Sequence, residues 1–564
     1  MTRLSRGPRA VSLALTALVL APVAAGLAGV LLPAAGYLPP LGGTALSLGP
    51  AKTLLAEPGL LRSTLLSAGT AFAATAISLA LTALILAAAL GSRALAIAER
   101  LIAPLLSVPH AAAALALALL IAPSGLILRA LSPCLTGLTL PPDVLIVHDP
   151  LGLTLTAALV VKETPFLFLM ALAALPQTDA TARLAVARTM GYGRMAAALH
   201  TVWPAVYSRI RLPVLAVLAF TASVVDMALI LGPTRPPPLA IRIMQWLQSP
   251  DLADWFTGAA AATLMLALLL TLIAAWWLLE RLASLAVAMW RLSGHRLAGD
   301  TPARHAILAL VVLAVGLLAA AFAGLVLQSL AGYWPFPNLW PSTISLTPVI
   351  ERLPMAAPVL ANTALIALGA TALTLLIAVA LLEMDRRGAP LSPILYAPLL
   401  VPQIAFLFGL NVFAIALGIA PGLLAVTLTH VVFTVPYALI ALAGPWRALD
   451  PRYEATAAAL GAGPLRRFLA VRVPMLTAPL AVAAALAFAT SVALYLPTQL
   501  IGSGRVATVT TEAVAASAGA DPRTAGLWAT LQLALPLVAF TVARALPAVL
   551  FRHRQALRPA RLAD

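Results

Sequence analysis

Charged residues are scarce in this chain: Asp, Glu, Lys and Arg make up 10% of its 564 residues, while 62% are hydrophobic. A soluble protein of this size would carry about 25% charged and about 45–50% apolar residues. The mean hydropathy is +1.01. Long apolar stretches such as 64–90 would have to be packed on every face in water. A soluble globular fold is therefore excluded, and we expect the chain in a lipid bilayer.

Cysteine and lysine are almost missing as well. The single cysteine, Cys134, cannot form a disulfide within the chain, which excludes a disulfide scaffold. The only lysines are Lys52 and Lys162, and neither follows a glycine. An ATP-binding P-loop needs Gly-x-x-x-x-Gly-Lys-Ser/Thr, so this chain is not expected to hydrolyse ATP. His110 and His200 lack metal-ligand spacing, and we expect no catalytic residue, no metal and no bound cofactor.

Apolar runs long enough to cross a bilayer occur twelve times. Each span needs about 20 apolar residues to cross a hydrocarbon layer of about 30 Å. The predicted spans are 10–34, 64–90, 101–121, 151–175, 212–231, 257–279, 306–331, 358–382, 392–418, 421–443, 476–499 and 525–550. We therefore predict an all-α polytopic membrane protein with about 12 transmembrane helices.

The positive charges lie mostly on one side of these spans. With the N-terminus in the cytoplasm, the inner segments hold 25 of the 35 basic and 9 of the 19 acidic residues, while the outer loops hold 8 of each. Cytoplasmic loops retain arginines during insertion. The net charge of +16 thus reflects topology rather than nucleic-acid binding. We predict a bacterial inner membrane location, with both termini cytoplasmic.

The first apolar run follows Arg3, Arg6 and Arg9, an arrangement that also occurs in cleaved signal peptides. The run continues to about Leu32, which is long enough to span the bilayer. We favour an uncleaved first helix, with a cleaved signal peptide as the alternative.

The sequence also repeats itself. Gly191, Gly193, Leu199 and Pro204 recur in the second half, in the same order and at the same spacing, as Gly461, Gly463, Leu469 and Pro474. Six spans precede a basic segment and six follow it, so the halves have the same orientation and are related by an axis along the membrane normal. We predict a first repeat at 1–280, a cytoplasmic linker at 281–305 and a second repeat at 306–564, with a solute route between the repeats.

The repeated segments, 176–204 and 444–474, lie on the cytoplasmic side. Each begins with an alanine-rich stretch that favours helix. Gly191 or Gly461 then suits a left-handed C-cap, and a second short helix is predicted to stop at Trp203-Pro204 or Val473-Pro474, where the proline can open the next helix. This pattern predicts a helix-turn-helix that projects from the bilayer. An ordinary connecting loop would not need the same spacing twice.

These segments resemble the coupling loops of permease subunits in bacterial ATP-binding-cassette (ABC) importers. The signature of that family is Glu-Ala-Ala, three residues, Gly, nine residues, then an aliphatic residue, one residue and Leu-Pro. The matching positions here are Ala185, Ala187, Gly191 and Pro204 in the first half, and Ala455, Ala457, Gly461 and Pro474 in the second. The glutamate is missing from both halves, although Glu454 lies one residue before its position.

The resemblance implies partners and a function. In that family the loop docks in a cleft of a separate ATPase dimer, which binds ATP and Mg, and a solute-binding protein delivers a small solute from outside. The missing carboxylates imply a differently charged cleft. Two fused units look like the ferric-iron and thiamine branch, and the segment from Tyr495 to Ala513 looks most like its Ynj-type fused permeases. The identity of the solute does not follow.

Polar residues inside the predicted spans are weaker signals. An ionisable group near the centre of a membrane helix costs about 2.5–3.5 kcal/mol or more, so it usually faces protein or water. A structural role, such as a hydrogen bond between helices, is the alternative for each. The candidates for a translocation path are Lys162, Glu163, Asp226, His430, Tyr495 and Gln499.

Two other classes of protein remain open. A secondary transporter also uses two parallel six-helix halves, but it needs no ATPase. A membrane-embedded lipid-linked transferase would need a clustered acidic or metal-binding site near one face, and the sequence shows none.

Overall fold

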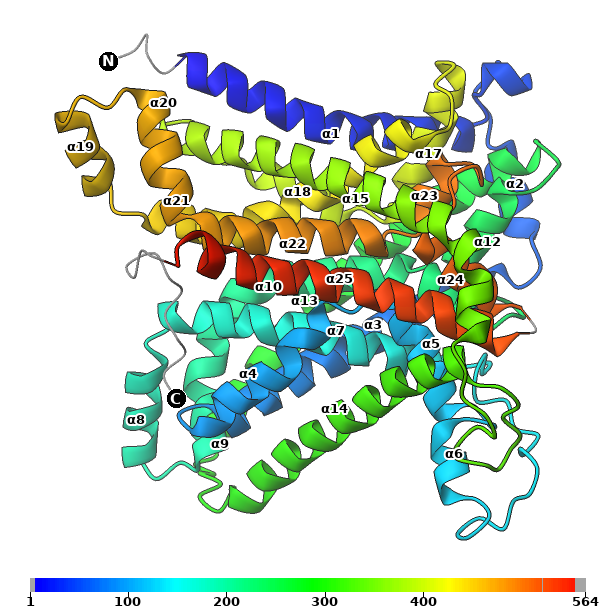
Figure 1. Cartoon of the computed structure of the whole chain (residues 1–564), viewed down its shortest axis with the longest axis horizontal. Coiled ribbons are helices and arrows are strands. Elements are labelled where there is room, and N and C mark those ends of the chain that lie inside the picture. The colour runs from blue at the N-terminus through cyan, green and yellow to red at the C-terminus, as the bar shows by residue number, and fades with distance from the viewer. Residues whose placement is uncertain (1–5, 520, 553–564) are drawn as a thin grey trace.

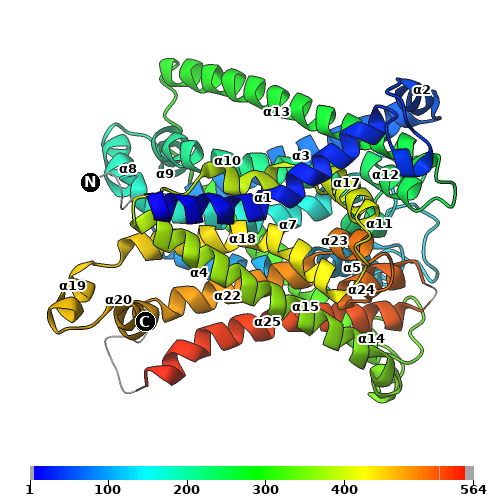
Figure 2. The same ribbon diagram turned by 90° about the horizontal axis from the view of Figure 1, so that it is seen from above.

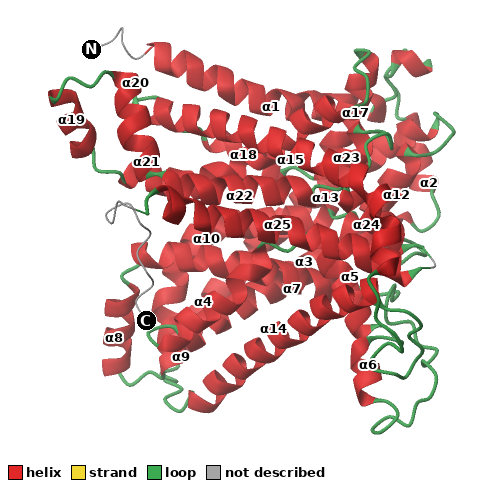
Figure 3. Ribbon diagram, viewed as in Figure 1, coloured by secondary structure: helices red, strands yellow, loops and turns green. Residues whose placement is uncertain are grey.

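The computed structural model describes residues 6–519 and 521–552. Within these residues the secondary structure is helical, and no β-strand is formed (Figure 3). Ten helices are long and apolar enough to cross a bilayer, and two bent helix pairs raise the number to twelve if each pair is one span. The predicted all-α polytopic fold is therefore confirmed.

The helices form two series of similar order. The first comprises α1 (Arg6–Ala34), α2 (Gly49–Ala56), α3 (Leu60–Ala89), α4 (Arg93–Leu106), α5 (His110–Ile121), α6 (Leu126–Leu131), α7 (Leu153–Ala174), α8 (Ala180–Thr189), α9 (Arg194–Ala197), α10 (Trp203–Ser223), α11 (Asp226–Leu231), α12 (Leu239–Leu247) and α13 (Asp254–Leu292). The second comprises α14 (Thr301–Leu330), α15 (Thr347–Arg386), α16 (Ala397–Leu400), α17 (Gln403–Ala416), α18 (Leu423–Ala448), α19 (Arg452–Ala459), α20 (Pro464–Arg467), α21 (Val473–Met475), α22 (Thr477–Ala493), α23 (Leu496–Ile501), α24 (Val509–Ser517) and α25 (Pro522–Leu550).

The long helices run side by side and leave short helices at both ends of the bundle. The helices α8, α9, α19 and α20 project from one end, while α2, α6 and α12 gather with the longer loops at the other (Figures 1 and 2). The most hydrophobic stretch of α18 is 61% buried, whereas that of α14 is 11% buried. The helix α18 is thus central, and α14 offers its apolar side chains to lipid.

The first helix of each series packs on the other series. The helix α1 lies against α17, and α14 lies against α5. The contact between α1 and α17 is a close backbone approach, because a Cβ atom at Gly409 would lie 1.8 Å from the carbonyl oxygen of Gly26. Small residues allow such approaches between membrane helices.

Several predicted spans are broken. The predicted span 101–121 is interrupted between Leu106 and His110, where α4 ends and α5 begins. The span predicted at 212–231 is instead α10, which starts at Trp203, followed by a separate α11. The other two breaks are a 95° bend between α16 and α17, inside 392–418, and the gap between α22 and α23, inside 476–499. The prediction of continuous helices was wrong at these four places.

Candidate functional site

Two short helical units project from the same end of the bundle (Figure 1). We name residues 180–202 the first elbow and residues 452–472 the second elbow. Each consists of an alanine-rich helix (α8 or α19), a glycine turn, a four-residue helix (α9 or α20) and a five-residue π-helical turn (Ala198–Val202 or Phe468–Arg472). The same order of elements therefore occurs at both predicted segments.

A glycine ends the first helix of each elbow in the same way. Gly191 and Gly461 have φ angles of 86° and 81°, which favour glycine because a Cβ atom destabilises the left-handed region. In the first elbow the next amide, that of Tyr192, donates to the Ala187 carbonyl. The second elbow repeats this bond from Ala462. The predicted left-handed caps are confirmed, and the pattern satisfies carbonyls that a helix end leaves free.

The second helix of the first elbow does not stop where the sequence predicted, whereas that of the second elbow does so within one residue. Pro204 lies in the first turn of α10, which continues from the π-helical turn without a break. Proline is tolerated there because its missing N–H is not needed in a first turn. In the second elbow the chain bends by 75° after Met475, past Pro474. The predicted stop at Pro204 was therefore wrong, whereas the helix of the second elbow ends at Met475, one residue after the predicted stop at Pro474.

A buried ion cluster holds the second elbow to the end of α15. The Arg472 guanidinium is 3% exposed and donates to carboxylate oxygens of both Glu383 and Glu454. Arg386 donates to the same two carboxylates, at 2.9 Å to Glu383 and 3.0 Å to Glu454. Glu454, one residue from the expected glutamate position, is thus engaged within the chain and is not a free charge for a partner.

The first elbow fills the same place with apolar side chains. When the elbows are aligned on their glycine caps, Leu184 and Val202 correspond to Glu454 and Arg472. Leu86 likewise precedes Gly91 as Glu383 precedes Gly388. All three apolar residues are buried in one hydrophobic cluster. The two elbows therefore have the same backbone but different anchors.

The remaining elbow residues predicted from sequence divide by exposure. Ala185 and Ala455 are exposed, Ala187 is buried, and Ala457 is half-buried against its neighbours. Large apolar side chains also face outward, including Val186 (62% exposed) and Met190 (57%) in the first elbow and Leu460 (83%) in the second. Each elbow thus presents a small, partly apolar surface beyond the bundle.

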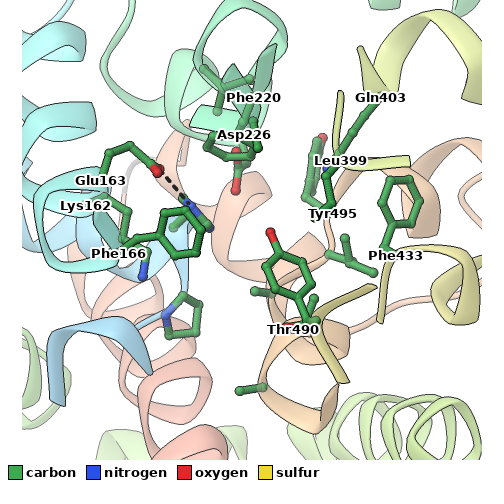
Figure 4. A pocket seen from close by; sticks show the side chains of 18 of the residues that line it. Lys162, Glu163, Phe166, Phe220, Asp226, Leu399, Gln403, Phe433, Thr490 and Tyr495 are labelled. Carbon is green, nitrogen blue, oxygen red and sulfur yellow. Dashed lines mark ion pairs between the residues drawn. The ribbon is translucent and has the colours of Figure 1, made fainter. Parts of the chain in front are cut away.

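A cavity of about 170 Å³ lies near the middle of the bundle, between the two helix series. Its walls come from α7 and α10 of the first series and from α16, α18 and α22 of the second. Figure 4 shows acidic groups on one side of it and aromatic rings around it. The aromatic residues that line it are Phe166, Phe220, Phe433, Tyr437, Tyr495 and Phe540.

The four helix breaks surround this cavity. Its lining includes residues 107–109, 224–225, Val401 and 494–495, which separate α4 from α5, α10 from α11, α16 from α17 and α22 from α23. Non-helical backbone at membrane depth is tolerated where it is buried in protein or lines a cavity. All four breaks therefore line the same cavity, which could not be inferred from any one of the segments alone.

The charged side chains in the cavity have different partners and point in different directions. The Lys162 ammonium donates to the carbonyl oxygens of Leu105 and Leu106, at 3.3 and 3.2 Å, and points away from Asp226 (Figure 4). Glu163 faces the other way, with a carboxylate oxygen 3.6 Å from Nε2 of His110. No Lys, Arg or His nitrogen of the described residues lies within ion-pair distance of the Asp226 carboxylate. Lys162 thus donates hydrogen bonds to the end of α4, while the Glu163 and Asp226 carboxylates face the cavity.

The structure brings four of the six predicted path residues together and places two elsewhere. Lys162, Glu163, Asp226 and Tyr495 line the cavity, whereas His430 and Gln499 do not. The His430 ring is 1% exposed and is hydrogen-bonded to the hydroxyls of Ser491 (2.8 Å) and Thr498 (3.0 Å). It joins α18 to α22 and α23.

Sequence reasoning missed several cavity residues, among them His110, Tyr437 and Thr490. They come from three different helices, α5, α18 and α22, so no local spacing could have grouped them. Among the described residues, no group of three or more His, Cys, Asp or Glu side chains is placed to hold a metal ion.

Comparison with known proteins identifies the family. The chain is 31% identical over 455 residues to the inner membrane ABC transporter permease protein YnjC of Escherichia coli (strain K12), and the match covers 80% of this chain and 82% of that protein. The chain belongs to the ABC transporter permeases. No protein-family model matches it, and no solved structure matches it.

This membership places the permease in a membrane, with an ATPase as its partner. A permease is a transport subunit, which agrees with a chain built of apolar helices around a central cavity. The residues available for transport are then those of the cavity and of the two elbows.

Proposed function

We propose that this permease forms the complete solute pathway of an ATP-driven importer and docks a separate ATPase dimer through its two elbows. The observation that carries the proposal is the pair of elbows at one end of the bundle, each with the same glycine cap and π-helical turn. Two equivalent elbows suit an ATPase that has two equivalent subunits. ATP, Mg and the hydrolytic residues belong to that partner.

The two halves act as duplicated repeats, 1–280 and 306–564, joined by the cytoplasmic segment 281–305. Helix breaks at corresponding places support this reading, since the breaks at 224–225 and 494–495 follow the glycine caps of their own halves at the same distance along the chain. The elbows and both termini would lie in the cytoplasm, and the opposite end would receive solute from a binding protein. The fused permeases of the ferric-iron and thiamine branch are the group that this arrangement suits best.

The cavity is the proposed solute site of the pathway. Both halves contribute walls, so any movement of one half against the other changes its shape. Closure of the ATPase dimer would pull the elbows together and expose the cavity first to one side of the membrane and then to the other. Lys162, Glu163, Asp226 and Tyr495 line the path, whereas His430 and Gln499 lie outside the cavity lining.

Co-purification tests the docking role directly. Gly191→Pro and Gly461→Pro cannot keep the positive φ of the cap, because proline fixes φ at about −65°. Each should sharply reduce the amount of ATPase that purifies with the permease. Gly418→Pro is the matched control, since Gly418 also has a positive φ (67°) but lies in the turn between α17 and α18. Full ATPase recovery with both elbow variants would contradict docking through the elbows.

A further inference from the structure

A groove of about 370 Å³ opens between α10 and α13, on the outer face of the first half. It shares no lining residue with the central cavity. Figure 2 shows the elbow-side end of α13 standing apart from α10. Leu270 and Trp277, which line the groove, are 68% and 49% exposed. The groove therefore opens toward the surrounding bilayer.

The lining changes from polar to apolar along the groove. Since α10 runs away from the elbows and α13 runs back toward them, Arg211 and Glu280 lie at the elbow end. The deeper part is lined by the apolar residues Leu215, Leu270, Ile273 and Ala274. A charged end that continues into an apolar floor matches the two parts of a lipid, which are a polar headgroup and an acyl chain.

The polar end lies at the depth of lipid headgroups. Arg209, two residues before Arg211 in α10, donates to the carbonyl oxygen of Gln177 at 2.6 Å. Gln177 is the last residue of the membrane-crossing segment that contains α7. Tryptophan is enriched where a membrane meets water, and Trp277 lines this part of the groove. A bound lipid can therefore place its headgroup beside Arg211 and its chain in the hydrocarbon layer.

A chain of hydrogen bonds holds the polar end in place. The Arg211 guanidinium donates to Oε1 of Glu280 at 3.0 Å and has a second nitrogen 2.6 Å from Oε2. The Tyr207 hydroxyl also donates to Glu280 and accepts from the ring N–H of Trp276 at 3.1 Å. Among the described residues, Glu280 is the only hydrogen-bond or ion-pair partner of Arg211. A guanidinium carries five N–H donors, so Arg211 keeps donors for a ligand.

Positive charge exceeds negative charge at this end. The helices α10 and α13 contribute three guanidinium groups here, from Arg209, Arg211 and Arg281, and one carboxylate, from Glu280. Arg281 stacks on Trp277, with its guanidinium carbon 4.9 Å from the ring centroid. Guanidinium groups form charge-assisted hydrogen bonds with phosphate oxygens. The excess of positive charge favours an anionic headgroup over a zwitterionic one.

The second half has alanines at the equivalent positions of α22. The glycine caps of the elbows and the helix breaks that follow them align α10 with α22 at a single spacing. Arg211 and Leu215 of the groove then correspond to Ala481 and Ala485. The side chains that line the groove on α10 are thus replaced by methyl groups on α22.

The helix α25 completes this difference. The sequence Ala-Thr-Leu-x-Leu-Ala-Leu occurs at 262–268 in α13 and again at 529–535 in α25. This alignment makes Ala543 the counterpart of Trp276. Ala543 packs directly on the two alanines of α22. The first half therefore has a charged and aromatic groove where the second half has a close helix contact.

We infer that the groove between α10 and α13 binds an anionic phospholipid from the leaflet on the elbow side. The lipid phosphate accepts hydrogen bonds from Arg211 and Arg281, and one acyl chain lies along Leu215, Leu270 and Ile273. The bilayer that surrounds the groove supplies this ligand. The alanine contact of the second half leaves no room for a chain, so one such lipid binds to each permease.

Native mass spectrometry of the purified full-length permease tests the inference. Dioleoyl phosphatidylglycerol and dioleoyl phosphatidylcholine are added separately to the protein in detergent. The first phosphatidylglycerol should bind about tenfold more tightly than the first phosphatidylcholine, because basic residues at the membrane surface attract anionic headgroups. Ala274 is exposed, and Ala274→Trp should remove the tight binding by filling the apolar floor. Arg281→Gln should reduce the preference for phosphatidylglycerol but keep the weak binding of phosphatidylcholine.

Thr541→Trp is the matched control, since Thr541 of α25 is the exposed counterpart of Ala274. This variant should bind phosphatidylglycerol as tightly as the parent does. The inference is overturned if the parent binds the two lipids equally well, or if Ala274→Trp binds phosphatidylglycerol as tightly as Thr541→Trp. An Arg281→Gln variant with the full preference of the parent would likewise contradict the headgroup contact. Since neither ATPase nor solute is present, these results are independent of the docking proposal.

Discussion

The buried guanidinium of Arg472 donates to the Glu383 carboxylate and thereby joins the second elbow to the last turn of α15. The partners are 89 residues apart in sequence, and their side chains are 3% and 10% exposed. The second elbow is therefore attached to α15 through charged groups. In the first elbow the same connection is made by apolar packing.

Removing one member of this pair should destabilise the permease strongly. Arg472→Met leaves the two carboxylates with the half-exposed Arg386 as their shared cation, and breaking a buried pair costs up to about 3–5 kcal/mol. Thermal unfolding in detergent should show a clear fall in midpoint. The triple variant Glu383→Leu, Glu454→Leu, Arg472→Val copies the anchor of the first elbow and should recover most of the loss, since apolar replacement of a whole ion cluster is often neutral. An Arg472→Met variant as stable as the parent would contradict this account.

Lys162 should act mainly on stability. Lys162→Met leaves the Leu106 carbonyl at the end of α4 without the Lys162 donor, whereas the Leu105 carbonyl still accepts from the Val108 amide at 3.3 Å. An unsatisfied buried polar group costs about 1–3 kcal/mol. The unfolding midpoint should fall. The matched variant Glu163→Gln removes a charge next to it but keeps those bonds, so it should change the midpoint less. Equal effects of the two variants would mean that Lys162 and Glu163 act as a pair.

The cavity should admit water-soluble reagents. In a Cys134→Ser background, the Thr490→Cys variant should react with a small methanethiosulfonate, because Thr490 lines the cavity. The control is Ala112→Cys, at a position that is 0% exposed and outside the cavity lining. If the two variants react at the same rate, the cavity is not connected to water and the proposed path is wrong.

Asp226 should matter for transport more than for folding. Its carboxylate has no cationic nitrogen within ion-pair distance among the described residues and faces the cavity (Figure 4). Asp226→Asn should lower uptake by the reconstituted importer while the unfolding midpoint stays close to that of the parent. Glu280→Gln is the control, since Glu280 pairs with Arg211 at 2.6 Å outside this cavity. Unchanged uptake with Asp226→Asn would remove this residue from the path.

Much of the fold could be predicted because its signals are local. Spans follow from runs of apolar residues, and the glycine caps of the elbows follow from spacing within a few residues. The end of the first elbow was mispredicted because proline is tolerated in the first turn of a continuing helix as well as at a stop. Pro204 lies in such a position.

The cavity could not be predicted in the same way. The break at Val224 and Val225 contains neither glycine nor proline, so the surrounding helices, not the segment itself, end α10 there. The His110–Glu163 contact joins two helices that share no motif. Lys162 and Glu163 point apart because neighbouring residues on a helix are about 100° apart, but the groups that they meet depend on the positions of α4 and α5.

The exchange of first helices between the halves has a consequence for how this molecule holds together. Because α1 packs on α17 and α14 packs on α5, each half contributes its first helix to the surface of the other half. A nick between α13 and α14 should leave them associated, so covalent continuity is not what keeps the assembly intact. The residues between α13 and α14 are therefore not needed to hold the two halves together. They can instead act on the first elbow, which they contact.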